Sequence, residues 1–391
     1  MSSPRRSLFS GLTMTAAVGA ALLVSACAAP SSSSSSSAAG GGSASGSATA
    51  AAADAKTAKS AADLGGMDAL VAAAETEGKL NVIALPPDWA NYGEIIKAFQ
   101  TKYPKITVTS AQPDISSQEE INAINTNKGT DRAPDVVDIG MAVALANTAV
   151  FAPYQVATWA DIPAAQKEST GLWFQDYGGY MAVQYDSAKV PAPTSIADLL
   201  KPAYKGKVAL NGDPTTANAA LNGVMMASIA SGGSVDDISK GVDFFKQLKA
   251  AGNFVAVKAS TATIKAGTTQ VVLDWDYLSA SAIKNVPTWK VTVLDNAVLG
   301  GYYAQAINKD APHPAAARLW EEFLYSDAGQ NLWLKGGARP VRMDAMTKAG
   351  TIDPAAAATL PKVSGTPVFM SPDQATAAKT YLAANWAKAI G

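Results

Sequence analysis

The feature that most constrains the fold of this chain is a regular alternation of short apolar segments with amphipathic helical segments. Three apolar runs are typical of buried strands and lie at 80–85, 106–110 and 135–139. Between the first two runs, residues 92–102 place Ile95, Ile96 and Phe99 on one helical face and end before Pro104. Strands that alternate with helices predict an α/β fold, in which a mostly parallel sheet is flanked by helices on right-handed crossovers.

The same alternation begins again near Pro191. Further strands are expected at 207–210, 271–273, 291–294 and 302–307, with helices opening after residue 212, at 241–251 and from residue 314 onward. Polar and aromatic residues follow the strand ends in both halves. The pattern therefore predicts two lobes with a cleft between them.

The first 27 residues have the order of a secretory leader. Arg5 and Arg6 precede an apolar stretch, residues 8–21, which is too short to anchor the chain across a bilayer. Small residues then lead into Cys27, the single cysteine of the chain. This arrangement resembles the lipobox of bacterial lipoproteins, which implies cleavage before Cys27 and lipidation of that residue. The arginine pair also resembles a twin-arginine export signal, and the choice between the two export routes stays open.

A low-complexity segment follows the predicted lipid site. Residues 28–59 are almost entirely Ser, Ala and Gly, and residues 31–37 are all serine. Such a segment buries too little apolar surface to offset the entropy of ordering its backbone, so we expect a disordered tether over 27–62. About thirty residues of this type span roughly 30 Å on average. The tether would hold a folded body, 63–391, near the outer face of the cell membrane.

Composition excludes several classes of function. The formal charge is −1, and no basic cluster suited to nucleic acid is present. The chain has one histidine, His313, which we expect at the surface, and no cysteine besides Cys27. A serine protease triad and a zinc site therefore lack the residues they need, and no glycine-rich phosphate loop is found. We expect a protein that is not an enzyme and that holds no cofactor or metal.

Three segments carry a resemblance to a known family. They are 198–209, with the sequence DLLKPAYKGKVA, 312–317, with PHPAAA, and 323–330, with FLYSDAGQ. They resemble bacterial extracellular solute-binding proteins of ABC transporters, in the subgroup that contains polyamine and ferric-iron binders. The likeness extends over about 80–342.

The resemblance implies a type 2 periplasmic-binding-protein fold that closes over its ligand like a Venus flytrap. Lobe 1 would comprise 63–182, lobe 2 would comprise 183–298, and 299–391 would return to lobe 1 and form the C-terminal helices. Hinge crossings are expected near 180–185 and 299–303. The implied partners are a small solute and the transmembrane subunits of an ABC permease, with the binding protein itself a monomer.

Acids and aromatic residues dominate the expected strand ends, where ligands bind in such sheets. A carboxylate that is desolvated by lobe closure needs a cation opposite it, and aromatic faces attract ammonium groups. The favoured ligand is therefore an amine, and the resemblance points to a polyamine such as spermidine or putrescine. The candidate ligand-binding residues are Asp88, Trp89, Asn91, Tyr92, Asp176, Tyr177, Asp213, Thr215, Trp275, Asp276, Tyr277 and Tyr302.

Four alternatives remain. Ferric iron would use Tyr302 and Tyr303, which share a face only if the chain turns there. An amino acid or a γ-aminobutyrate-like zwitterion would need a cation such as Arg339 for its carboxylate. An aminophosphonate would use a helix amino terminus near Thr215, Thr216 and Asn218. A surface glycosidase, the most remote alternative, would use Asp274 and Asp276, which share a face if the strand continues through them.

Overall fold

The computed structural model of this 391-residue chain describes residues 54–391. The predicted leader, Cys27 and most of the predicted tether lie outside the described residues. Within the described part, no helix is both long enough and apolar enough to cross a membrane.

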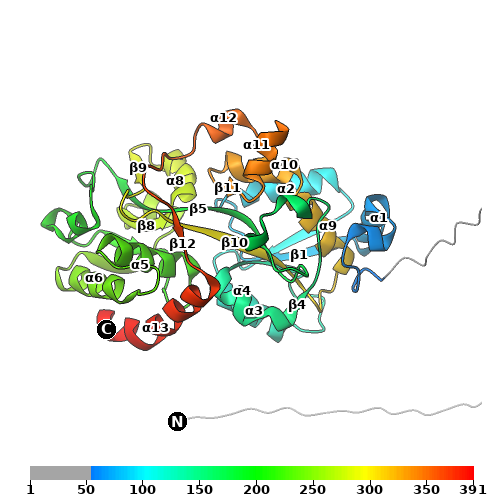
Figure 1. Cartoon of the computed structure of the whole chain (residues 1–391), viewed down its shortest axis with the longest axis horizontal. Helices are drawn as coiled ribbons and strands as arrows, with labels where there is room; N and C mark the ends of the chain where they lie inside the picture. Colours follow the sequence, from blue (N-terminus) through cyan, green and yellow to red (C-terminus); the bar gives the residue numbers. More distant parts are fainter. Residues whose placement is uncertain (1–53) are drawn as a thin grey trace, which may run out of the picture. The chain divides into compact units, whose positions relative to one another are not determined.

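Lobe 1 is built around two sheet regions (Figure 1). Its strands are β1 (Lys79–Ile83), β2 (Thr107–Ala111), β3 (Val136–Gly140), β4 (Phe151–Ala152) and β11 (Arg339–Pro340). Its helices are α1 (Met67–Glu77), α2 (Tyr92–Lys102), α3 (Ser117–Thr126), α4 (Met141–Ala146), α9 (Pro314–Leu324), α10 (Asp327–Lys335), α11 (Met343–Ala349) and α12 (Pro354–Ala357). β1 and β2 pair in parallel, whereas β3 and β4 pair antiparallel with β10 (Leu299–Asn308).

Lobe 2 has a smaller sheet with helices on both sides. Its strands are β6 (Val208–Leu210), β7 (Phe254–Lys258), β8 (Val271–Trp275) and β9 (Trp289–Thr292). Its helices are α5 (Asn218–Ala230), α6 (Ser239–Ala250), α7 (Thr261–Lys265) and α8 (Ser279–Asn285). β6 pairs in parallel with both β7 and β8.

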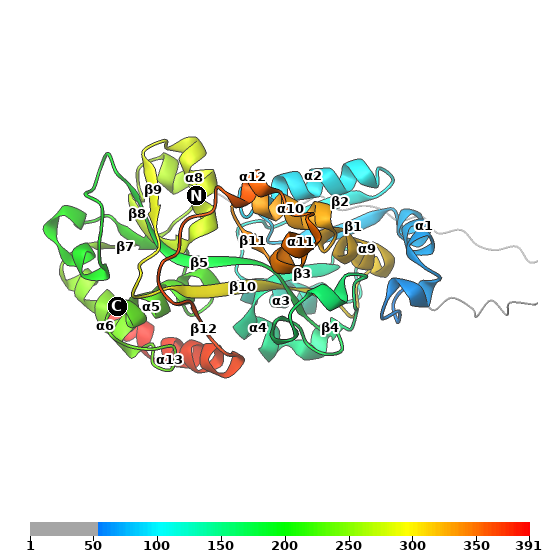
Figure 2. The same cartoon turned by 45° about the horizontal axis from the view of Figure 1, so that its top comes forward.

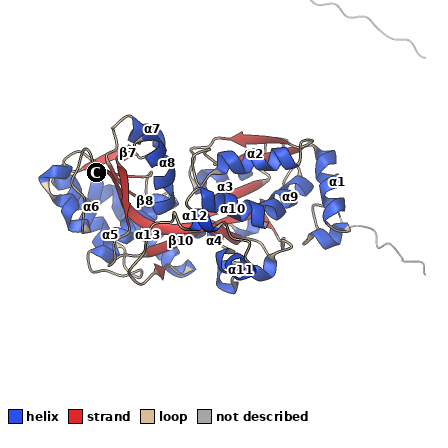
Figure 3. Ribbon diagram, turned by 90° about the horizontal axis from the view of Figure 1, so that it is seen from above, coloured by secondary structure: helices blue, strands red, loops and turns tan. Residues whose placement is uncertain are grey.

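The two long strands β5 (Phe174–Asp186) and β10 run between the lobes (Figures 2 and 3). The first half of β5, up to Tyr180, pairs with β10, and the second half, from Met181, pairs with β8 and β9. All of these pairings are antiparallel. The two-lobed α/β fold predicted from the sequence is confirmed, but the sheets are mixed rather than mostly parallel, because β5 runs antiparallel to β8, β9 and β10, and β10 runs antiparallel to β3 and β4.

Local sequence explains where the helices begin and which face they bury. Ser116 and Glu119 form a capping box at the start of α3, and the Ser116 N–H donates to Glu119 Oε2 at 2.7 Å. On α2 the buried side chains include Ile95 and Phe99. The Phe99 ring packs edge-on against Trp320 of α9, with ring centroids 5.2 Å apart, so the amphipathic face of α2 joins the lobe-1 core.

The folded body begins earlier than the predicted residue 63. Ala58 is 1% exposed, and Ala61 and Leu64 also belong to the core. Arg318 of α9 donates from Nε to the Ala58 carbonyl at 2.8 Å. Residues from about 54 are therefore packed against lobe 1, because their alanines fill a buried site and a buried arginine satisfies their carbonyl groups.

The C-terminal helix α13 (Pro372–Ile390) does not stay with lobe 1. After the short strand β12 (Val368–Phe369), which pairs with the start of β10, α13 lies beside α5 and α6 of lobe 2 (Figure 2). Trp386 packs against Phe245 with ring centroids 5.4 Å apart. Lys379 Nζ, on the same helix, donates to Gln118 Oε1 of α3 at 3.3 Å, so α13 contacts both lobes.

Candidate functional site

A cavity of about 530 Å³ lies between the two lobes. Lobe 1 contributes the loop after β1, the segment that leads into α3 with the first turn of that helix, Asp138 in the middle of β3 and one residue of β10. Lobe 2 contributes the loop after β6 that opens α5, the segment from the end of β7 into α7, and the end of β8. The polar and aromatic lining residues are Asp88, Trp89, Asp114, Ser116, Ser117, Glu119, Glu120, Asp138, Gln184, Asn211, Asp213, Thr216, Asn218, Lys258, Ser260, Thr261, Asp274 and Tyr303.

The cavity is strongly acidic. Seven of its lining residues are aspartate or glutamate, against one lysine, Lys258. The Lys258 ammonium already donates to the Asp114 carbonyl oxygen at 2.5 Å, a contact from β7 of lobe 2 to a lobe-1 loop. The lining therefore carries an excess of negative charge that a cationic ligand would offset.

Asp138 is the central acid on the lobe-1 side. Tyr92 and Tyr177 both donate their hydroxyl groups to Asp138 Oδ2, at 2.9 and 2.8 Å. Asp138 Oδ1 is buried and has no hydrogen-bond partner among residues 54–391. Burial raises the pKa of Asp138 to about 7, although the two tyrosine hydrogen bonds act in the opposite direction.

Strand periodicity places Asp138 in the site. Val137 and Ile139 of β3 point into an apolar cluster on one side of the strand, so Asp138 between them points to the other. Glu120 of α3 lies beside it, is 1% exposed, and accepts the Asp138 N–H at Oε2 over 3.3 Å. Burial, with Asp138 as a second cause, raises the pKa of Glu120 well above its usual range. Two buried carboxyl groups thus adjoin each other at this side of the cavity.

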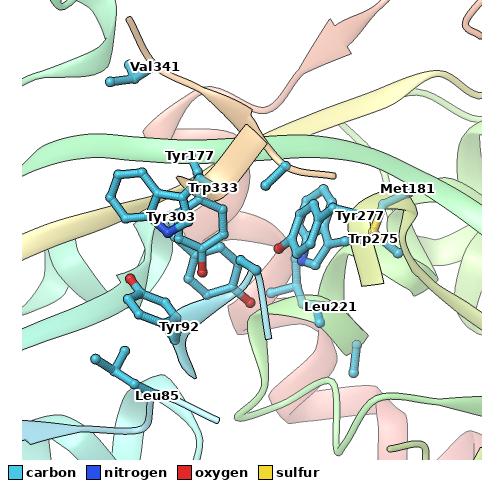
Figure 4. Close-up of a cluster of buried hydrophobic side chains, with 14 of the residues drawn as sticks. Leu85, Tyr92, Tyr177, Met181, Leu221, Trp275, Tyr277, Tyr303, Trp333 and Val341 are labelled. Atoms are coloured by element: carbon cyan, nitrogen blue, oxygen red, sulfur yellow. The ribbon is translucent and has the colours of Figure 1, made fainter. Parts of the chain in front are cut away.

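The two tyrosines that hold Asp138 belong to a buried aromatic cluster, which also contains Tyr303 and Trp333 (Figure 4). The Tyr177 ring lies parallel to that of Tyr303, with centroids 5.9 Å apart, and Trp333 packs against Tyr177 at 5.1 Å. The Trp89 Nε1 group donates to the Tyr177 hydroxyl at 2.6 Å. Trp89 and Tyr303 pack edge-on at 5.7 Å and both line the cavity, so aromatic surface adjoins the buried carboxyl pair.

Lobe 2 contributes a third buried acid, Asp274. It is the fourth residue of β8 and accepts hydrogen bonds from Asn211 Nδ2 and from the Trp275 N–H, both at 2.9 Å. Burial raises the pKa of Asp274 to about 7. Acidic groups therefore face the cavity from both lobes.

Three of the predicted ligand residues, Asp88, Trp89 and Asp213, line the cavity. Thr215 lies next to it, in the turn that Asp213 stabilises by accepting the Thr215 N–H at 2.8 Å. Asn91 instead donates to the Leu332 carbonyl of α10, also at 2.8 Å. Of this group, the first three have direct access to a ligand.

Tyr92, Tyr177 and Asp176 lie one layer behind the cavity wall. The two tyrosines hold Asp138, and Gln305 links Tyr92 to Asp176 by donating to Asp176 Oδ2 at 2.8 Å. All three predicted residues are completely buried. They position the acid at the cavity rather than lining the cavity themselves.

The predicted residues at the end of β8 are also behind the wall. Asp276 forms an ion pair with Arg339, with 2.6 Å between Oδ2 and Nη1, and its side chain is fully buried. Trp275 and Tyr277 are buried in the apolar core, with their rings parallel and 6.2 Å apart. β8 ends at Trp275 and a 3₁₀ turn follows, so Asp276 leaves the face that Asp274 occupies.

The side chains of Tyr302 and Tyr303 also lie in different places. Tyr303 lines the cavity, whereas the Tyr302 ring lies against Phe369 of β12 at 6.4 Å. The paired-tyrosine arrangement considered for iron is absent from the described residues. Arg339, considered for a carboxylate, is engaged by Asp276 and does not line the cavity.

Asp138 and Glu120 were not among the site residues predicted from the sequence; Tyr303 was considered only as an iron ligand, and Asp274 only for a glycosidase. A usable signal existed for Asp138, which is an acid in the interior of the run Val136-Val137-Asp138-Ile139. A charged residue there is costly unless it has a specific role. Glu120 offered no such signal, because α3 reads as an ordinary capped amphipathic helix.

The prediction of a surface position for His313 is wrong. The side chain is buried beside the start of α9, where Nδ1 lies 2.9 Å from Asp135 Oδ2 and Nε2 lies 3.2 Å from Asp131 Oδ1. The hydrogen bond with Asp135 raises the pKa of His313. His313 belongs to a polar cluster at the edge of lobe 1 and does not line the cavity.

An α/β body with two lobes, crossing strands between them and a cavity enclosed by both defines an extracellular solute-binding protein. The chain belongs to that family, since the model for bacterial extracellular solute-binding proteins matches residues 134–377. Proteins of this family act outside the cytoplasm in ABC transport and deliver small solutes to ABC permeases; they are transport proteins, not enzymes. No curated protein matches the chain.

Solved structures with the same fold include several binding proteins. A periplasmic thiamin binding protein is 18% identical, with a TM-score of 0.62, over 80% of this chain and 96% of its own. A substrate binding protein of an ABC transporter from Agrobacterium tumefaciens is 16% identical, with a TM-score of 0.62, over 80% and 94%. Iron-bound HitA from Pseudomonas aeruginosa is 20% identical, with a TM-score of 0.57, over 80% and 99%. At these identities the likeness establishes the fold.

Proposed function

We propose that this protein captures a small cationic amine in the cavity between its lobes and delivers it to a membrane permease. A polyamine such as spermidine or putrescine is the favoured ligand. The observation that carries the proposal is Asp138, an acid that lines the cavity and whose buried Oδ1 has no hydrogen-bond partner among the described residues. An ammonium group supplies both the charge and the donor that such an oxygen requires.

The rest of the lining supports an amine. Trp89 and Tyr303 present aromatic surface to the cavity, and an ammonium group over such a ring gains about 0.5–2 kcal/mol. Asp274 provides an acid on the opposite lobe, so a ligand with two amino groups would meet a carboxylate at each end. Lobe closure about β5 and β10 would bury the ligand and desolvate these contacts.

The cellular setting follows from the leader. Lipidation of Cys27 would hold the body at the outer face of the membrane, near the permease. The flexible reach of the tether would then be shorter than first expected, because residues from about 54 pack on lobe 1.

A thermal-shift panel tests the ligand class. Spermidine, putrescine, γ-aminobutyrate, an aminophosphonate and ferric ion are compared on protein that begins at residue 54. A ligand at one hundred times its Kd stabilises the folded state by about 2.7 kcal/mol, which shifts the melting temperature measurably. We expect the amines to stabilise the protein and Asp138→Asn to abolish their effect.

Asp243→Asn is the matched control, because Asp243 is exposed on α6 and does not line the cavity. This control should respond to amines as the wild type does. The proposal would be contradicted if ferric ion alone stabilised the protein, or if none of the amines did.

A zwitterion is the second candidate, and Lys258 is the observation that favours it. Its ammonium lies at the cavity, and within residues 54–391 its one hydrogen bond is to the Asp114 carbonyl, so a ligand carboxylate could replace that contact. In this case γ-aminobutyrate would outperform putrescine in the panel. Lys258→Met would then weaken γ-aminobutyrate and leave putrescine binding intact.

A further inference from the structure

We propose that the cationic ligand enters this site in exchange for a proton, which the ligand-free protein holds on the carboxyl pair of Glu120 and Asp138. This inference rests on the proposed function, since it needs a cation as the ligand. The exchange would make the affinity of the site for its cation depend on pH in the neutral range.

The first step is the geometry of the pair. Both side chains line the cavity and are almost fully buried, with exposures of 1% for Glu120 and 6% for Asp138. The Asp138 N–H donates to Glu120 Oε2 at 3.3 Å, so one acid is bonded to the backbone of the other. Two neighbouring buried acids with no base beside them cannot both ionise without a large cost, and a proton retained on one of them relieves that cost.

The second step is the layer behind the pair, which supplies more acid and no base. Asp176 of β5 is joined to Asp138 through Gln305 and Tyr92. Glu321 of α9 is fully buried, and neither of its carboxyl oxygens has a hydrogen-bond partner within residues 54–391. Among the described residues, no lysine or arginine forms a hydrogen bond or an ion pair with any of these four acids.

The elements packed on Asp138 present only neutral or acidic groups to it within the described part of the chain. α2 presents Tyr92, α3 presents Glu120, β5 presents Asp176 and Tyr177, and α9 presents Glu321; from further off, Tyr277, Tyr303 and Asp274 face the same region. All of these groups are neutral or acidic. Lys258, the lysine of the cavity lining, is directed to the Asp114 carbonyl.

The entry of the ammonium group is balanced in charge by the loss of a proton. Burial raises the pKa of Asp138 to about 7 and that of Glu120 well above its usual range, so the pair retains a proton near neutral pH. Burial likewise raises the pKa values of Glu321 and Asp176 well above the ordinary range. When an ammonium group reaches Asp138 Oδ1, the carboxyl O–H bond breaks, the proton passes to solvent, and the carboxylate pairs with the cation. One positive charge enters for each one that leaves.

Calorimetry with spermidine and putrescine tests the exchange. Titrations at pH 6.5 in buffers with different ionisation enthalpies report the number of protons released on binding. We expect a release approaching one proton, and an affinity that rises up to about tenfold per pH unit below pH 7 and levels off above it. The control Asp243→Asn should behave as the wild type.

Asp138→Asn and Glu120→Gln separate the roles of the pair. Asp138→Asn removes the carboxylate, so we expect it to weaken binding and to release no proton. Glu120→Gln removes the second acid of the pair, so we expect binding with a smaller release at pH 6.5 and a flatter pH profile. Infrared difference spectra should show the C=O stretch of a protonated carboxyl group disappearing when wild type binds spermidine.

The outcomes distinguish this inference from the proposed function. Amine binding with no proton release and no dependence of affinity on pH between 6 and 8 would overturn the exchange and leave the proposed function standing. Absence of amine binding at every pH would overturn both. Proton release that persists in Asp138→Asn and Glu120→Gln alike would also overturn the exchange, because the proton would then come from another group.

Discussion

The stability of the ligand-free protein should reveal the cost of burying Asp138. The perturbation is Asp138→Asn, which keeps the shape of the side chain and the acceptor for the Tyr92 and Tyr177 hydroxyls but cannot ionise. The pKa of Asp138 rises from 3.8 to about 7 on folding. A carboxyl group whose pKa is raised in the folded state makes the protein most stable at low pH, and this stability is lost as pH rises through the folded pKa.

The magnitude follows from that shift. Between pH 5 and 7 the folded protein binds a proton that the unfolded chain has already released, and each pH unit costs about 1.4 kcal/mol. Over two units the wild type therefore loses about 3 kcal/mol of unfolding free energy through this group. Asp138→Asn has no carboxyl group at this position and does not lose this stability. Its unfolding free energy relative to wild type should therefore rise by about 3 kcal/mol from pH 5 to pH 8.

Urea denaturation followed by tryptophan fluorescence at pH 5, 6, 7 and 8 measures the difference. Asp243→Asn, on the exposed face of α6, is the control and should parallel the wild type. Parallel curves for wild type and Asp138→Asn across the whole range would refute the reasoning, since Asp138 would then ionise as readily in the folded protein as in the unfolded chain.

Four further outcomes are expected. Asp276→Asn should lower the unfolding free energy by about 3 kcal/mol in urea denaturation, because it leaves Arg339 buried without its ion-pair partner, and it should leave amine affinity unchanged. Protein that begins at residue 63 should melt at a lower temperature than protein that begins at residue 54, because it loses the burial of Ala58 and Ala61 and the carbonyl partners of Arg318; equal melting temperatures would contradict the packing of this segment. His313→Gln should be less stable than wild type below pH 6.5, because it lacks the hydrogen bond between the charged imidazole and Asp135. In thermal melts the difference should shrink as pH rises through the raised pKa of His313, because the wild-type imidazole loses its charge there. Cys27→Ala should move the protein from the membrane fraction to the soluble fraction or leave it uncleaved, as fractionation and blotting would show; unchanged membrane association with a normally processed leader would contradict lipidation.

Periodicity predicted the local structure of the body well. The helix expected at 92–102 is α2 (Tyr92–Lys102), and α3 begins at the capping box that Ser116 forms with Glu119. These features succeed because helix caps and amphipathic faces depend on residues a few positions apart. The path of α13 could not be read in the same way, because its contacts with α6 join residues more than a hundred positions apart along the chain.

The site was harder to predict, for two physical reasons. A one-residue difference in where a strand ends decides which side chains face the cavity, so Asp274 lines it and Asp276 pairs with Arg339. An acidic residue usually indicates an exposed position, but Asp138 is buried inside an apolar strand. Strand-end rules selected Asp88 and Trp89, which line the cavity, but they passed over an acid in the middle of a strand.

A crystal structure of the protein with spermidine tests the central claim most directly. The account predicts an amino group of the ligand within about 3 Å of Asp138 Oδ1, beside Trp89 and Tyr303, with the lobes closed over it. A ligand that is bound in the same cavity but directs its amino groups away from Asp138, or a ligand held outside the cavity, would contradict it.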